Sequence, residues 1–244
     1  MSEQIVICTK KGADMNLANA FAAKMDVPIG TAMGDALTVV FDAKGVSLCG
    51  YGLSYQGDFE QMLHRVTNGR LQHEMLVRAA KTTQDLPRGI DATAGMGEDA
   101  FLLAAYGYRM TLYEQNPVIA LLLKDAIRRA RKHKELKEIA ERMQLVEGNS
   151  IEMLSKQVDN IDTIYLDPMF PARQKSGLIN KKLQLIQKLE PPCAKEEDLF
   201  DAAIAASPKK IIVKRPLKSP FLANRNPNHT FEGKAIRYDC YVVE

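Results

Sequence analysis

Two short segments constrain the fold of this chain more than any other feature: Asp91-Ala-Thr-Ala-Gly-Met-Gly97 and Asp167-Pro-Met-Phe170. Each follows an apolar run with the length of a buried strand. The first segment is a glycine-rich turn, and a helical pattern begins directly after it. A strand, a glycine-rich turn and a helix in this order are typical of a doubly wound sheet, whose ligands lie at the carboxyl ends of the strands.

The chain from about residue 86 alternates between strand and helix patterns, which predicts a parallel sheet covered on both faces. We expect strands at 89–93, 109–114, 144–147, 163–166 and 209–214, and one or two antiparallel closing strands within 235–243. The expected helices are 99–106, 117–133, 135–142, 179–189 and 196–206. The predicted fold class is therefore α/β, with a doubly wound, Rossmann-like sheet.

Residues 1–85 have a different pattern, which predicts a small mixed α+β extension. Its expected elements are a strand at 5–8, a helix at 14–25, a hairpin of 38–41 with 46–48, and helices at 59–66 and 71–81. We therefore divide the chain into an extension, 1–85, and a catalytic domain, 86–244. Arg65 and Arg70 make substrate positioning the expected role of the extension.

Composition excludes several classes of protein. The four cysteines are scattered without a C-x-x-C pair, and the four histidines lack metal-ligand spacing, so we expect reduced thiols and no metal site. No apolar stretch reaches the roughly 18 residues that span a bilayer. The first residues lack the charged and apolar regions of a signal peptide. A cytoplasmic protein with no membrane contact is the expectation, and the oligomeric state stays open.

The glycine turn predicts a nucleotide-type cofactor, because Gly95-x-Gly97-x-x-Ala100 lets the backbone approach a ligand. Dinucleotide and S-adenosylmethionine folds share this pattern. Glu98 and Asp99 decide between them, since two carboxylates at a helix N-terminus would repel a pyrophosphate. The sulfonium and ammonium of S-adenosylmethionine are compatible with both acids. We therefore predict S-adenosylmethionine.

Further cofactor contacts are expected at the ends of neighbouring strands. Asp91 ends the first strand, and Glu114, which ends the second, is placed to accept the protons of both ribose hydroxyls. Asn149 and Ser150 follow the third strand, from which polar groups reach toward the adenine.

The second segment predicts the chemistry. The amine nitrogen of a nucleobase is a poor nucleophile, because its lone pair is delocalised into the ring. The Asp167 carboxylate and the Pro168 carbonyl are placed to accept the amine protons, and Phe170 is placed to stack on an extruded base. Pro192-Cys193 has a competing interpretation, as the cysteine nucleophile that methyl transfer to cytosine C5 requires. Cys193 lies about 25 residues beyond the strand end, however, so a buried thiol between two helices is the better interpretation.

Charge is distributed unevenly along the chain. Residues 171–225 hold 12 Lys/Arg and 5 Asp/Glu, a net of +7 within a total of +3, so the rest of the chain carries −4. A nucleic-acid substrate would need such positive charge close to the chemistry. The candidate phosphate contacts are Arg173, Lys175, Lys181, Lys214 and Arg215.

Four motifs together resemble the bacterial 16S ribosomal RNA guanine-N2 methyltransferase family: 91–97, Tyr113-Glu-Gln-Asn-Pro117, Tyr165-Leu-Asp-Pro-Met-Phe-Pro171 with Gln174-Lys-Ser176, and Val213-Lys-Arg-Pro216. The resemblance implies a class I methyltransferase that modifies one guanine of 16S ribosomal RNA in the small subunit. It also implies cofactor contacts at Glu98, Asp99, Glu114, Gln115, Asn149, Ser150 and Asp167. The family often has arginine at positions 98 and 115 and serine at 149.

Two other functions remain open at this point. An NAD-dependent oxidoreductase could use a similar sheet, although the chain lacks a Tyr-x-x-x-Lys pair to support it. A non-catalytic RNA-binding module would bind RNA without S-adenosylmethionine.

Overall fold

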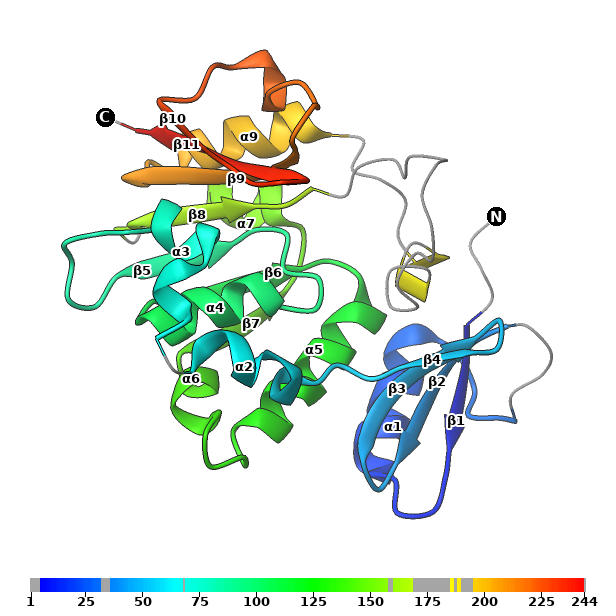
Figure 1. The fold of residues 1–244 in the computed structure, drawn as a ribbon. Helices are drawn as coiled ribbons and strands as arrows, with labels where there is room; N and C mark the ends of the chain where they lie inside the picture. Colours follow the sequence, from blue (N-terminus) through cyan, green and yellow to red (C-terminus); the bar gives the residue numbers. More distant parts are fainter. Residues whose placement is uncertain are drawn as a thin grey trace.

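The computed structural model describes residues 5–31, 36–67, 69–157, 160–168, 185–186, 188–189 and 195–243. The described chain forms two sheets, which lie on either side of one long helix (Figure 1). The larger sheet has seven strands in the order β10-β11-β9-β8-β5-β6-β7, and the smaller has four in the order β1-β2-β3-β4.

The larger sheet is parallel except at one edge. Its parallel strands are β5 (Arg88–Asp91), β6 (Arg109–Glu114), β7 (Met143–Glu147), β8 (Thr163–Leu166) and β9 (Lys210–Pro216). Strands β10 (His229–Glu232) and β11 (Ile236–Val242) form an antiparallel hairpin, of which β11 pairs with β9. From β5 the chain moves outward to β7 and then returns to β8 on the other side of β5. This reversal is the switch point where ligands bind.

Helices cover both faces of the larger sheet, because residues along each strand alternate between two apolar cores. In β8, Tyr165 belongs to one core and Ile164 and Leu166 belong to the other. The Tyr165 side is covered by α3 (Met75–Ala79), α4 (Glu98–Tyr106) and α6 (Lys137–Glu141). The opposite side is covered by α7 (Ser150–Ser155), α9 (Glu196–Ala205) and the short helical turn η3 (Leu222–Asn224).

The smaller sheet starts with a strand-helix-strand unit. Strands β1 (Ile5–Thr9) and β2 (Leu37–Asp42) are parallel and are joined through α1 (Met15–Met25), whose first turn is capped by Asp14. Strands β3 (Gly45–Gly50) and β4 (Leu53–Tyr55) then complete an antiparallel meander.

Helix α5 (Pro117–Ala130) joins the two sheets. Leu123 and Ile127 belong to the core of the larger sheet, whereas Val118 and Leu122 belong to the core of the smaller one. The helix therefore has apolar side chains on two faces, and ten of its residues are buried. The smaller sheet is held to the rest of the molecule through this shared helix.

A buried carboxylate adds a polar connection between α5 and the smaller sheet. Asp125 Oδ2 accepts hydrogen bonds from the Val46 amide at 3.1 Å and from Arg129 Nε at 2.9 Å. Its Oδ1 accepts one from Arg128 Nη2 at 2.6 Å. A Cβ at Gly45 would lie 2.4 Å from Asp125 Oδ2, so only glycine lets the β2–β3 turn approach this closely.

The segment before β5 packs on the larger sheet. It consists of short helical pieces, η1 (Phe59–Met62), α2 (Leu63–Val66), η2 (Leu71–His73) and α3, and its apolar residues join the core that contains α4. Figure 1 shows these pieces beside α4. None of the helices in the described part of the chain is long and apolar enough to cross a membrane.

The expected elements of the larger sheet are confirmed, with two corrections. Helix α7 was not predicted; it begins where Asn149 accepts the amides of Ile151 and Glu152. The closing hairpin begins earlier than expected, at His229. The two helices expected at 59–66 and 71–81 are broken into the pieces named above. Most of the helix expected at 179–189 lies outside the described residues.

We predict that Asp125→Ala lowers the free energy of unfolding by roughly 3 to 5 kcal/mol, because it leaves Arg129 and the Val46 amide without their buried acceptor. Urea unfolding of the two proteins measures the difference. Arg128→Ala is the control: it removes the partner that is 48% exposed and should cost no more than about 1 kcal/mol. Equal losses in both variants would contradict the structural role of Asp125.

Candidate active site

The glycine turn follows β5 and packs closely on α5. Gly95 and Gly97 have φ values of +52° and +73°, in the left-handed region that favours glycine. A Cβ at Gly97 would lie 2.7 Å from Leu123 Cδ1. Met96, between them, is 6% exposed and packs in the core of the smaller sheet. One side of the turn is therefore packed against α5 and the smaller sheet. The other side of its backbone lies at the carboxyl ends of the strands.

The Glu114 carboxylate lies against this turn. It is 5% exposed, and its oxygens accept hydrogen bonds from the Gly95 amide at 3.0 Å and the Asn116 amide at 2.7 Å. The carboxylate thus lies at the ends of β5 and β6, beside the glycine turn. The contact of Glu114 with the ribose hydroxyls stays a prediction.

Three further predicted residues lie at the same edge of the sheet. Asn149 Nδ2 donates to Gln115 Oε1 at 3.4 Å, and the Ser150 hydroxyl donates to the Ala92 carbonyl. These contacts hold the turn after β7 against the ends of β5 and β6. Gln115, Asn149 and Ser150 are therefore brought together, although two of them also serve the start of α7.

A lysine joins the two carboxylates expected to face the cofactor and the substrate. Lys214 Nζ lies 2.7 Å from Asp99 Oδ2 and 2.9 Å from Asp167 Oδ2. The Tyr165 hydroxyl donates to Asp99 Oδ2 at 2.6 Å. The backbone amide of Asp167 donates to the Thr93 hydroxyl at 2.6 Å. Elements that are distant in sequence are thereby fixed around the carboxyl end of β8.

Burial and charge shift the pKa values in this cluster in different directions. Burial alone would raise the pKa of Asp99, but the Lys214 ammonium and the Tyr165 hydroxyl lower it below its usual value. Within the described part of the chain no cation contacts Asp91, and burial raises its pKa to about 8 despite a hydrogen bond from the Thr93 amide. At neutral pH Asp99 is therefore ionised and Asp91 is protonated.

Other predicted residues have different surroundings. Glu98 is exposed at the start of α4, and its charge adds to burial in raising the pKa of Tyr55. Pro168 is buried beside Asp167. Arg215 has a side chain only 4% exposed and is paired with Glu196 of α9, so a phosphate contact there has no support in this placement. Phe170, Arg173, Lys175 and Lys181 lie outside the described residues.

The sequence analysis gave no role to Thr93 or Tyr165, and it assigned Lys214 to phosphate binding. Thr93 joins Asp91 to the backbone of Asp167 through its amide and its hydroxyl. The alternation along β8 would have placed Tyr165 on the α4 side of the sheet. Its hydrogen bond to Asp99 depends on the packing of α4, which the sequence does not give.

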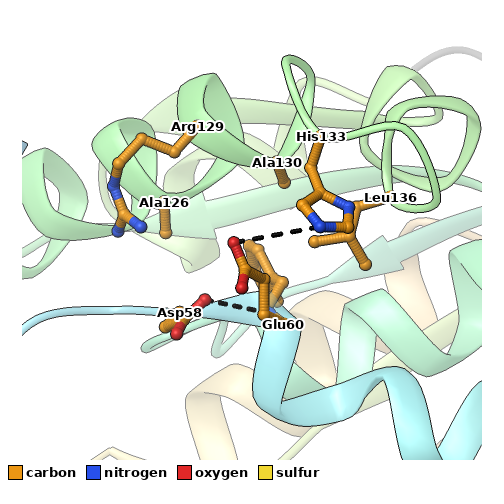
Figure 2. Close-up of a pocket in the computed structure, with 8 residues that line it drawn as sticks. Asp58, Glu60, Ala126, Arg129, Ala130, His133 and Leu136 are labelled. Atoms are coloured by element: carbon orange, nitrogen blue, oxygen red, sulfur yellow. Dashed lines mark hydrogen bonds and ion pairs between the residues drawn. The ribbon is translucent and has the colours of Figure 1, made fainter.

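A separate hollow lies between η1 and the last turns of α5 (Figure 2). In it, Glu60 Oε1 lies 4.0 Å from His133 Nε2, and Asp58 accepts the Glu60 amide at 2.9 Å. Its walls come from the end of α5 opposite to Asn116, so it is not part of the site at the strand ends. Among the described residues, no three His, Cys, Asp or Glu side chains are grouped to hold a metal ion.

Comparison with known proteins gives the class first. Residues 54–243 match the family described as putative SAM-dependent methyltransferases. A SAM-dependent methyltransferase from Neisseria gonorrhoeae has a solved structure that covers 98% of this chain and 96% of its own, with a TM-score of 0.78 at 28% identity. The strand order and the glycine turn agree with this class, and S-adenosylmethionine is the cofactor.

The relatives give the family. A protein of Thioalkalivibrio sulfidiphilus named ribosomal RNA small subunit methyltransferase J is 35% identical over 93% of this chain and 92% of its own length. A protein of Pseudomonas fluorescens with the same name is 36% identical over 92% and 89%. The chain therefore belongs to the ribosomal RNA small subunit methyltransferase J family. The oxidoreductase and the non-catalytic module receive no support from these comparisons.

We predict that Asp91 makes the protein less stable as pH rises. Its pKa is about 8 in the folded protein, against 3.8 as the usual value. Between these values the folded state holds a proton that the unfolded state releases, so the stability from this group is lost as pH rises toward 8. Relative to Asp91→Asn, the wild type should lose on the order of 1 kcal/mol per pH unit from pH 6 to 8.

Urea unfolding at pH 6, 7, 8 and 9 measures this difference. The asparagine keeps an oxygen that accepts from the Thr93 amide, so the comparison isolates the ionisation. Asp85→Asn, in the exposed loop before β5, is the matched control and should follow the wild type. If the stabilities of wild type and Asp91→Asn stayed parallel over this range, the burial of an ionisable Asp91 would be refuted.

Proposed function

We propose that this protein transfers a methyl group from S-adenosylmethionine to the exocyclic N2 of a guanine in 16S ribosomal RNA. The substrate is the RNA or the small ribosomal subunit in the cytoplasm, without membrane contact. The relatives named for ribosomal RNA methylation support the RNA target. The observation that carries the proposal is the position of Asp167 at the switch point of the sheet, next to the glycine turn.

The geometry supports a role for Asp167 in binding an amine. Its backbone is fixed by the Thr93 hydroxyl, and its side chain is fixed by Lys214. It is followed by Pro168, which has a rigid φ and a carbonyl that can accept a second amine proton. Two acceptors in a fixed relation suit an NH₂ group, and they direct its lone pair away from both.

S-adenosylmethionine supplies an electrophilic methyl group on a sulfonium sulfur. In the transfer the amine lone pair would form the N–C bond while the S–CH₃ bond breaks, and the electron pair of that bond would stay on sulfur in the leaving S-adenosylhomocysteine. The amine nitrogen would then be positive, and one of its protons must leave. Asp167 is ionised in its ion pair with Lys214, so its carboxylate can take this proton and pass it to water. Alignment of the amine with the donor carbon provides a large part of the acceleration.

The surroundings of the site are assigned as part of the same proposal. Phe170 stacks on the extruded base, and Arg173, Lys175 and Lys181 contact the RNA phosphates. Arg65, from α2, contributes on the substrate side. It forms two hydrogen bonds with Glu74, at 2.8 and 2.7 Å, and its charge helps lower the pKa of Asp99. Arg70 donates to the His64 carbonyl at the end of the same helix.

A methyl-transfer assay tests the reaction and the target together. Labelled S-adenosylmethionine is incubated with unmodified small subunits and, separately, with unmodified naked 16S RNA, and the products are digested to nucleosides. The expected product is N2-methylguanosine. Label in a different nucleoside, or none in either RNA alongside measurable cofactor binding, would overturn the proposed target while leaving the family assignment intact.

We predict that Asp167→Asn lowers kcat by roughly 10²- to 10⁴-fold, the usual contribution of a general base. The amide has nearly the same shape but cannot take the proton. It also loses the charge that pairs with Lys214, so the Tm should fall modestly while the protein stays folded, because Lys214 keeps Asp99 as its partner. Asp201→Asn, which alters an exposed ion pair with Arg225, is the control and should keep wild-type turnover. Turnover within threefold of wild type in Asp167→Asn would rule out this role for the carboxylate.

A further inference from the structure

Lys214 connects three elements that the sequence keeps far apart. It belongs to β9, while Asp99 begins α4 and Asp167 follows β8, and the two ion pairs span 115 and 47 residues of sequence. The exposed fractions of the Lys214, Asp99 and Asp167 side chains are 25%, 17% and 33%. These contacts are partly shielded from water, so they are stronger than ordinary surface ion pairs.

The groups around the ammonium keep it charged. Burial would lower the pKa of Lys214, but the carboxylates of Asp99 and Asp167 outweigh it and raise the pKa well above its usual value. Among the residues that the structure describes, the other titratable or charged groups near this cluster are Asp91 on β5, Tyr165 on β8, Tyr238 on β11 and Arg65 on α2. Lys214 is therefore a permanent cation and cannot act as a base.

The two ion pairs of Lys214 limit how the Asp167 carboxylate can rotate. Oδ2 of Asp167 is held by Lys214 at 2.9 Å, while Lys214 is itself held by Asp99 at 2.7 Å and Asp99 by Tyr165 at 2.6 Å. Each member of this chain of contacts comes from a helix or strand of the main sheet or from a residue that follows directly. The orientation of Asp167 is therefore set by packed elements and not by a free side chain.

Lys214 also determines the net charge of this cluster. Asp99, Asp167 and Lys214 together carry a net charge of −1, and Asp91 is protonated at neutral pH. S-adenosylmethionine carries one positive charge more than the product S-adenosylhomocysteine, on its sulfur. While both carboxylates stay ionised, loss of the ammonium leaves a net charge of −2, which attracts the sulfonium more strongly and does not change the attraction for the uncharged thioether of the product.

We propose that Lys214 is a positioning residue of the methyl-transfer site, which orients Asp167 toward the substrate amine and limits the negative charge that the sulfonium meets. The orienting role rests on the proposed function of Asp167. The role in charge does not depend on the RNA target, because it concerns only the binding of the cofactor and its product. The lysine favours turnover at some cost in cofactor affinity.

The experiment compares Lys214→Met, Lys214→Gln and Lys214→Arg with wild type by calorimetric binding of S-adenosylmethionine and S-adenosylhomocysteine at pH 7, where Asp91 is protonated, and by turnover. In the Met and Gln variants, the ratio of the product Kd to the cofactor Kd should rise on the order of tenfold. Lys214→Met should lower kcat at least tenfold with little change in the KM for RNA. Lys214→Arg keeps the charge, so its Kd ratio should match wild type and its kcat should lie between the two.

Lys209→Met is the matched control. It removes the lysine that directly precedes the same strand, where Nζ lies 2.7 Å from Asp162 Oδ1, and it should leave the Kd ratio and kcat unchanged. Lys214→Gln keeps a polar group that can donate to one carboxylate, so it provides the neutral variant if Lys214→Met does not fold.

An unchanged Kd ratio in a folded neutral variant would overturn the charge role, and a wild-type kcat in Lys214→Met would overturn the orienting role. If wild-type protein methylates neither form of the RNA, the proposed function fails, while the Kd ratio still decides the charge role.

Discussion

The close packing of the glycine turn on helix α5 is the constraint on which the rest of this structure depends. Gly97 approaches Leu123 so closely that a Cβ would meet it at 2.7 Å, and Met96 enters the core on the other side of the same helix. This contact fixes the start of α4, and with it Asp99. Because ion pairs join Asp99 to Lys214 and Lys214 to Asp167, the packing of the turn also influences where the Asp167 carboxylate lies.

The site combines groups that would each be unfavourable alone. Asp99 and Asp167 are partly buried carboxylates that share one ammonium, and Asp91 is a fully buried carboxyl that stays protonated at neutral pH. A single lysine between two acids leaves the site slightly negative, which suits a cofactor with a net positive charge. The charge of the cluster is therefore complementary to that of S-adenosylmethionine and is produced by few fixed charges.

The sheet, the glycine turn and the acid at the end of β8 could be predicted from the sequence, because each is a local pattern of apolar runs and turn residues. Lys214 and Arg215 show what such local patterns do not predict. They are adjacent cations in the sequence, and a charge count gave both the same role. On a strand they point to opposite faces, so Lys214 meets Asp99 on the α4 side and Arg215 meets Glu196 on the α9 side. The domain boundary expected at residue 85 stays a prediction, and the packing of residues 59–79 on the larger sheet favours an earlier one.

The insertion of Met96 into the core of the smaller sheet has a consequence for how the chain can be divided. Met96 stands between Gly95 and Gly97, and it packs in the core of the smaller sheet, whose strands are not part of the larger sheet. The smaller sheet, which is formed by the first fifth of the chain, therefore helps to hold the glycine turn rigid. A variant that lacks residues 1–56 would expose Met96 and the Val118 face of α5 to water. Its glycine turn would lose the packing that keeps it in one conformation.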